Sequence, residues 1–141
     1  MFNTGRKILL VESDPVLRDI IALALQRLNT QNDEYQVIAA DEPGDVMQFL
    51  GKDRPQLLIL DLYLPQMNGL DLIAQLKQQG LLGRIPIMVI SAFGYREIVE
   101  QAVRAGASAF LVKPIDVDEF VNRARIVIEQ AWGLSARSAE S

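Results

Sequence analysis

The chain has 141 residues, half of them hydrophobic, with 14 basic and 18 acidic side chains and a formal net charge of −4. This length suits one domain with its own core, the acidic balance argues against nucleic-acid binding, and no apolar run approaches membrane-spanning length. Cys and His are both absent, which excludes disulfides, thiol chemistry and a histidine phosphate carrier within the chain, and we expect a cytoplasmic protein.

Short apolar segments alternate with longer amphipathic ones in chain order. The apolar segments predict buried strands, which cover residues 7–11, 35–40, 56–60, 85–91 and 108–112. The amphipathic segments predict helices, which cover residues 14–28, 42–51, 69–80, 95–106 and 116–131. Continuous apolar strands alternating with helices are typical of a parallel sheet covered on both faces. The sequence therefore predicts an α/β fold of five strand–helix pairs, (βα)5.

The predicted organisation is a single domain over residues 1–132. Asp14 precedes Pro15, a combination that favours a helix start, and Asp116 with Glu119 three residues later predicts another. The last nine residues, GLSARSAES, are small and polar. We therefore expect residues 133–141 to form a flexible tail.

Polar side chains follow four of the five predicted strands. The first strand is followed by Glu12-Ser13-Asp14, the third by Asp61, the fourth by Ser91 and the fifth by Lys113. Right-handed crossovers place the carboxyl ends of parallel strands on one rim, where open α/β sheets bind their ligands. A carboxylate there can act as a nucleophile toward phosphorus. Mg²⁺, an ammonium and a hydroxyl are suited to neutralise the transferred phosphoryl group.

Four sequence blocks carry a resemblance to a known family. They are KILLVESDPVLR, LLILDLYLPQMNGLDLI, IPIMVISA and AGASAFLVKPID, and they follow one another in the family's order and spacing. Over about residues 6–131 the chain resembles the response-regulator receiver domains of two-component signalling, the CheY-like family. The resemblance implies a flavodoxin-like, doubly wound fold with strand order 2-1-3-4-5.

The resemblance also implies roles for individual residues. Asp61 would be the phosphoacceptor, with Ser91 as the switch hydroxyl, Lys113 as the conserved-type lysine and Phe110 as the switch aromatic. Magnesium would be held by Glu12, Asp61 and the backbone carbonyl of Tyr63. The phosphoryl donor would be a sensor histidine kinase or a phosphotransfer protein. Phosphorylation would change the protein contacts of the surface formed by the fourth helix, fifth strand and fifth helix.

One position departs from the family pattern. Receivers usually have two acidic residues after the first strand, and the second is a direct metal ligand; here Ser13 stands in its place. A hydroxyl is a poor substitute for a carboxylate on Mg²⁺, so we expect weaker metal binding and slower phosphorylation. Asp14 is one position late and is expected to cap the helix instead. Tyr63 is bulky and is expected to screen water from the phosphoryl group.

Two functional hypotheses follow, with a third from another class. The first is a stand-alone receiver that is not an enzyme toward external substrates and signals to a downstream protein target, with no direct contact to nucleic acid or membrane. The alternative is a degenerate receiver, an interaction module independent of phosphate because of Ser13. The third is a flavin or nucleotide binder, which the acidic segment ESDPVL disfavours.

Ile126 and Trp132 fall outside the core stripe of the last helix and leave a partner or homodimer contact open.

Overall fold

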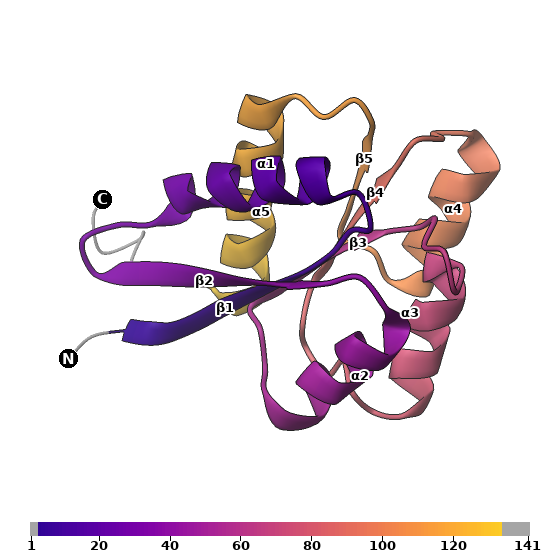
Figure 1. Cartoon of the computed structure of the whole chain (residues 1–141), viewed down its shortest axis with the longest axis horizontal. Helices are drawn as coiled ribbons and strands as arrows, with labels where there is room; N and C mark the ends of the chain where they lie inside the picture. The colour runs from indigo at the N-terminus through magenta and orange to yellow at the C-terminus, as the bar shows by residue number, and fades with distance from the viewer. Residues whose placement is uncertain (1–2, 134–141) are drawn as a thin grey trace.

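Five parallel strands form one sheet with α-helices on both faces (Figure 1). The computed structural model describes residues 3–133. The strands are β1 (Asn3–Val11), β2 (Asp33–Ala40), β3 (Leu57–Asp61), β4 (Ile87–Ser91) and β5 (Ala109–Val112). The helices are α1 (Pro15–Leu25), α2 (Pro43–Lys52), α3 (Gly69–Gln78), α4 (Arg96–Ala105) and α5 (Val117–Trp132), with a 3₁₀ turn η1 (Gln26–Leu28) after α1. The order is β2-β1-β3-β4-β5, which confirms the predicted flavodoxin-like fold.

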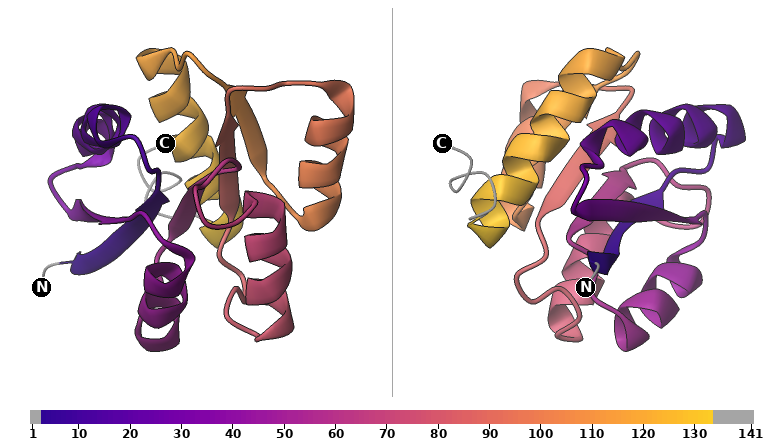
Figure 2. Two further views of the ribbon diagram at one scale, coloured as in Figure 1. Left: turned by 45° about the vertical axis from the view of Figure 1, so that its right-hand side comes forward. Right: turned by 90° about the vertical axis from the view of Figure 1, so that its left-hand side faces the viewer.

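Two hydrophobic cores hold the helices to the sheet. On one face α1 and α5 pack over alternate residues of the central strands, including Leu10 and Ile59. On the other face α2, α3 and α4 pack over the intervening residues, including Leu9 and Leu60. Figure 2 shows the two helix layers on opposite sides of the sheet. All residues of β3 are buried, as expected for a central strand covered on both faces.

The strands β1 and β2 are longer than predicted. β1 pairs with β2 from Asn3 onward, whereas its pairing with β3 begins only at Ile8. The first part of β1 therefore extends beyond the rest of the sheet, paired with β2 alone (Figure 1). The side chain of Arg6 forms an ion pair with Asp33, at 3.1 Å between Nε and Oδ1, in this extension. Such polar, charged segments lack the apolar run that identified the other strands.

The predicted helix starts are confirmed by their caps. The Asp14 carboxylate accepts a hydrogen bond from the backbone N–H of Val16 at 3.0 Å, with Pro15 as the first helical residue. Asp116 accepts from the backbone N–H of Glu119 at 3.0 Å at the start of α5. Each cap satisfies backbone donors that a helix leaves unpaired. Asp14 is thus committed to α1, as predicted.

Trp132 lies outside the predicted core stripe of α5, yet the structure shows it partly buried. Its indole N–H donates to the backbone carbonyl of Gln56 at 2.9 Å, and its ring packs partly buried against the α1–α5 core. The guanidinium of Arg84 lies over the ring, 5.3 Å from its centroid. Ile126, by contrast, is 39% exposed. A helical projection of α5 could not predict these contacts, because Gln56 and Arg84 belong to the loops before β3 and β4.

Some predictions concern the chain ends and the membrane. The predicted flexible tail falls almost entirely on residues 134–141, outside the described residues; of it only Gly133 is described, as the left-handed cap of α5. Within residues 3–133, none of the helices has the length and apolarity needed to cross a membrane.

Candidate functional site

Three charged side chains meet at the carboxyl ends of β1, β3 and β5. The ammonium Nζ of Lys113 lies 2.6 Å from Oδ2 of Asp61 and 3.0 Å from Oε1 of Glu12. Glu12 is 1% exposed and Asp61 4% exposed. We call Glu12, Asp61 and Lys113 the charged triad. The sequence predicted that these three would share a rim, and the structure brings them into contact.

Burial sets the electrostatics of the triad. Desolvation raises the pKa of Glu12, and the nearby Asp61 adds to the rise, whereas hydrogen bonds from the Asp14 N–H and Lys113 oppose it. For Lys113, desolvation lowers the pKa, but hydrogen bonds to Asp61 and Glu12 outweigh it and leave the pKa raised. The ammonium is therefore held in its charged form, and it offsets part of the repulsion between two buried carboxylates.

Local backbone contacts fix the position of Asp61. Its Oδ1 accepts from the backbone N–H of Tyr63 at 2.9 Å, while Oδ2 faces Lys113. Gly69 closes the following loop by donating its N–H to the Leu62 carbonyl at 2.7 Å. A Cβ on Gly69 would lie only 2.8 Å from the Leu62 Cα and 2.9 Å from the Asp61 carbonyl oxygen. The close approach of these backbones therefore requires glycine.

The two remaining predicted residues lie on β4 and β5. Ser91 is fully buried at the end of β4, and its Oγ accepts from the backbone N–H of Phe93 at 3.0 Å. Its hydroxyl hydrogen is left to donate to another acceptor. Phe110 is half-buried on β5, paired with Val89, and packs against the α2–α4 core. Both positions are compatible with the predicted switch, and the switch itself stays a prediction.

Sequence reasoning missed a residue that braces the site. Arg18 on α1 donates from its guanidinium to the Glu12 backbone carbonyl at 3.1 Å and lies 3.8 Å from an Asp41 carboxylate oxygen. It thus ties the loop after β1 to the end of β2. Its position one turn into α1 gave no sign of this role, because the contact depends on how α1 packs over the sheet.

Sequence reasoning also missed two of three aromatic side chains that line up beside the triad. Tyr63 meets Phe93 edge-to-face, with ring centroids 5.2 Å apart, and Phe93 stacks on Tyr95 at 5.8 Å. We call Tyr63, Phe93 and Tyr95 the aromatic row. A signal was present: Phe93 follows Ser91 by two residues, just as Tyr63 follows Asp61, and β3 and β4 are neighbours.

The donor set fits a magnesium ion of the kind that keeps several waters. Mg²⁺ is commonly held by one or two carboxylates together with waters and phosphate oxygens. Glu12 and Asp61 supply two carboxylates, and the buried Oε1 of Glu12 is contacted by the Lys113 ammonium at 3.0 Å without regular hydrogen-bond geometry. Asp14 caps α1 and does not replace the carboxylate that Ser13 lacks.

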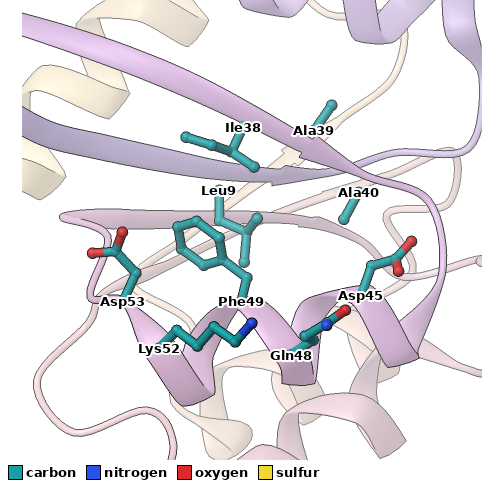
Figure 3. A pocket seen from close by; sticks show the side chains of 9 residues that line it. All are labelled: Leu9, Ile38, Ala39, Ala40, Asp45, Gln48, Phe49, Lys52 and Asp53. Carbon is teal, nitrogen blue, oxygen red and sulfur yellow. The ribbon is translucent and has the colours of Figure 1, made fainter.

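Two of the hollows on the molecular surface differ in their distance from the charged triad. One, of about 360 Å³, lies between β2 and α2, with Phe49 and Ile38 at its centre and Lys52 and Asp53 at one end (Figure 3). The other, of about 490 Å³, lies between α1 and the start of α5 and is bordered by Lys113. Only the second adjoins the charged triad.

Comparisons with known proteins agree with this geometry. Residues 8–125 match the response regulator receiver domain family. The chain is 35% identical over 121 residues to the transcriptional regulatory protein KdpE of Staphylococcus aureus, covering 86% of this chain and 49% of that protein. It thus spans about half the length of the curated relatives it matches.

Solved structures give the same result. The receiver domain of the sensor histidine kinase PA1611 from Pseudomonas aeruginosa, with a magnesium ion coordinated in its active-site cleft, is 25% identical. The superposition covers 89% of this chain and 98% of the PA1611 receiver domain, with a TM-score of 0.75. The Francisella response regulator 1452 receiver domain, 18% identical, shares the fold with a TM-score of 0.77, covering 89% of this chain and 98% of that one. The chain belongs to the response regulator receiver domain family, whose members are signalling modules of two-component systems.

Proposed function

We propose that the protein accepts a phosphoryl group on Asp61 from a histidine kinase or phosphotransfer partner and signals through altered protein contacts. The observation that carries this proposal is the charged triad: a buried carboxylate at the end of β3, with an ammonium 2.6 Å from Oδ2. Two comparisons support the same chemistry: the match to the receiver family and the similarity to a receiver domain with magnesium in its active-site cleft. Asp61, Ser91 and Lys113 are the residues to which we assign the reaction.

The reaction follows from what these side chains can do. An Asp61 carboxylate oxygen attacks the phosphorus of a phosphohistidine, the P–N bond breaks, and its electron pair leaves with the imidazole nitrogen. The Tyr63 N–H holds one oxygen of Asp61 in place, and Lys113 neutralises negative charge as a positioned cation. The Ser91 hydroxyl is placed to donate to a phosphoryl oxygen. Magnesium, held by Glu12, Asp61 and the Tyr63 carbonyl, supplies further charge neutralisation when bound.

The donor is proposed to dock over α1. The hollow between α1 and α5 is bordered by Lys113 and lined by apolar side chains such as Leu17 and Ile20. Val16, Ile20 and Leu23 are exposed along α1. An amphipathic helix laid on this surface would bring its own side chains to the rim beside Asp61. The continuity of this apolar surface with the charged triad supports the assignment.

The output is proposed to lie on the α4–β5–α5 face. Val103 on α4, Val112 on β5 and Val117 at the start of α5 are exposed apolar side chains of these elements. Phosphorylation of Asp61 adds negative charge there, and this change is expected to alter the face through Ser91 and Phe110. A downstream protein target, cytoplasmic location and the stand-alone form predicted from the sequence are part of this proposal.

The competing candidates are distinguished by specific features. Ser13 favours a degenerate receiver, because it leaves only two carboxylates for the metal. A flavin or nucleotide binder is disfavoured because the Asp14 carboxylate already occupies the amino end of α1, where a phosphate would bind.

The test is intact mass after incubation with acetyl phosphate and Mg²⁺. We expect a gain of one phosphoryl group in the wild-type chain and none in Asp61→Ala. If the wild type gains nothing, Ser13→Asp is measured in the same way. Rescue by Ser13→Asp would identify a degenerate site that lacks its metal ligand, and failure of both would refute the assigned chemistry.

A further inference from the structure

The strand β2 forms an open edge of the sheet. Among the strands of residues 3–133, it pairs with β1 alone and ends the sheet on the side opposite β5 (Figure 1). An open edge presents a row of backbone N–H and C=O groups that can form a ladder with another strand. Which of these groups are free depends on the loop that precedes β2.

The loop before β2 covers the first half of this edge. The side-chain oxygen of Asn29 accepts a hydrogen bond from the Tyr35 N–H at 2.8 Å. The Thr30 N–H donates to the Asp33 carbonyl, also at 2.8 Å. These contacts satisfy backbone groups at the start of β2 and place the loop where a partner strand would otherwise lie.

The second half of the edge is free. Backbone groups of alternate residues point to the same edge of a strand, so Val37 and Ala39 direct their N–H and C=O groups to the same side as Tyr35. For the residues that the structure describes, no neighbouring strand or loop bonds to these groups. Val37 and Ala39 flank Ile38, which is therefore the centre of the free edge.

The sequence of this segment lacks the usual protections of an edge strand. Residues 35–40 read YQVIAA and contain no charged residue, Pro or Gly. Natural edges are commonly blunted by Lys, Pro or inward-pointing charges. Short uncharged segments with β-branched residues instead favour pairing with another strand. The chemistry of the segment therefore favours an added strand over permanent exposure to water.

Hollows lie on both faces of β2 beside the free edge. The hollow of about 360 Å³ between β2 and α2 is lined by Ile38, and Phe49 points from α2 toward the strands (Figure 3). A hollow of about 450 Å³ on the α1 face is lined by Tyr35 and Val37 of β2 and by Ala22 of α1. Side chains of a strand alternate between the two faces of a sheet. An added strand would therefore place side chains in both hollows.

We propose that two copies of the chain associate through antiparallel pairing of their β2 strands across a two-fold axis at Ile38. In this register, Val37 of each copy exchanges backbone hydrogen bonds with Ala39 of the other, which satisfies the free groups of both residues. Each chain leaves β2 after Ala40 and so stays clear of the loop bonded to Tyr35 in the other copy. The pairing is closed, because neither copy keeps a free β2 edge.

The charges of α2 fit the same arrangement. Asp45 and Lys52 are exposed at opposite ends of the hollow beside Ile38 (Figure 3). An antiparallel two-fold arrangement reverses the direction of the hollow, so the Asp45 end of one copy meets the Lys52 end of the other. Asp53 at the Lys52 end is already paired with Lys7. Complementary charge therefore favours this orientation over a parallel one, which would bring like charges together.

The arrangement leaves the proposed chemistry accessible. The charged triad lies at the carboxyl ends of β1, β3 and β5, and antiparallel pairing points these rims of the two copies in opposite directions. The α4–β5–α5 face lies at the far edge of each sheet. The association therefore needs no phosphorylation of Asp61, and it is tested independently of that function.

The experiment measures self-association of the unphosphorylated chain by sedimentation equilibrium over a range of protein concentrations. Ile38→Lys places like charges directly opposite each other across the axis. Ala39→Pro removes an outward N–H, and proline is tolerated at such an edge position because the ladder with β1 does not use that group. Ile126→Lys is the matched control, because Ile126 is exposed on α5, a rival dimer surface. Circular dichroism verifies that each variant is folded.

Hydrogen exchange of the backbone amides locates the contact. Only the monomer exposes the amides of Val37 and Ala39, so they should exchange about tenfold more slowly once about nine-tenths of the chain is dimeric. The amides of Gln36 and Ile38 point to β1 and should depend far less on concentration. Slower exchange confined to another element would place the contact elsewhere and overturn the pairing.

Support requires a monomer–dimer equilibrium in wild type and in Ile126→Lys, with association weakened about tenfold or more in Ile38→Lys and Ala39→Pro. Association lost in Ile126→Lys but kept in Ile38→Lys would place the dimer on α5 and overturn the proposal. A wild type that stays monomeric at every concentration would overturn it as well, and so would growth into assemblies larger than a dimer. None of these outcomes bears on phosphoryl uptake by Asp61, which is measured separately by mass.

Discussion

Replacing Lys113 by Met is expected to destabilise the fold by about 2–3 kcal/mol near neutral pH. The ammonium lies 3.0 Å from Glu12 and 2.6 Å from Asp61, and both carboxylates are buried. Removing one partner of a fully buried ion pair typically costs about 3–5 kcal/mol. The Lys113 side chain is itself 22% exposed, so solvent screening reduces that figure.

The same substitution is expected to make stability depend on pH. Burial already raises the pKa of Glu12, and loss of the neighbouring cation raises it further. A carboxyl group whose folded pKa is raised costs stability when it is charged, and that cost vanishes as the pH falls below its ordinary value of 4.5. The deficit of Lys113→Met should therefore shrink steadily between neutral pH and about pH 4.5.

Urea unfolding monitored by tryptophan fluorescence measures both effects in wild type and Lys113→Met. A triple variant, Glu12→Gln with Asp61→Asn and Lys113→Met, serves as control and should recover most of the loss, because it leaves no unpaired buried charge. If Lys113→Met unfolds within about 0.5 kcal/mol of wild type at neutral pH, the triad is not a coupled buried network and our reasoning is wrong.

Three further predictions test other parts of the structure. Gly69→Ala should lower the unfolding free energy by about 1–3 kcal/mol and slow phosphoryl uptake, because the added methyl group must displace backbone; unchanged uptake measured by mass would contradict this. Trp132→Phe should cost about 1 kcal/mol in urea unfolding followed by circular dichroism, through the lost hydrogen bond to Gln56; an unaltered midpoint would show that this bond contributes nothing. The contact with Lys7 lowers the pKa of Asp53, so Asp53→Asn should reduce stability at neutral pH, and the difference should fade as the pH drops through the folded pKa, below 3.8. A gap of equal size at neutral pH and at about pH 3 would argue against that ion pair.

The alternation of apolar and amphipathic segments was sufficient to predict an α/β fold with a five-stranded parallel sheet, whereas the strand order followed from the family resemblance. β3 shows why: its residues Leu57–Asp61 are buried on both faces, so the strand is apolar throughout and ends at the first charge. The charged triad could be predicted to share a rim from topology alone. The bridging position of Lys113 between two carboxylates could not, because it depends on side-chain reach across three strands.

Contacts between separate loops were not predicted, because they depend on which elements lie side by side in the fold. Phe93 meets Tyr63 only because β3 and β4 are neighbours in a particular register. The hydrogen bond of Trp132 was not predicted because a helical projection ignores the loop before β3, whose Gln56 carbonyl accepts its N–H. The extension of β1 from Asn3 was missed because backbone pairing with β2, rather than burial, maintains it.

The position of Trp132 makes the chain its own optical reporter. It is the only tryptophan in the sequence, and its indole is hydrogen-bonded to Gln56, immediately before β3, whereas Asp61 ends that strand. Five residues of extended strand separate the two points by about 16 Å. A metal ion or phosphoryl group at Asp61 therefore cannot touch the indole. Any change in emission on phosphorylation would record a rearrangement transmitted along β3 or α5, free of direct quenching at the site of chemistry.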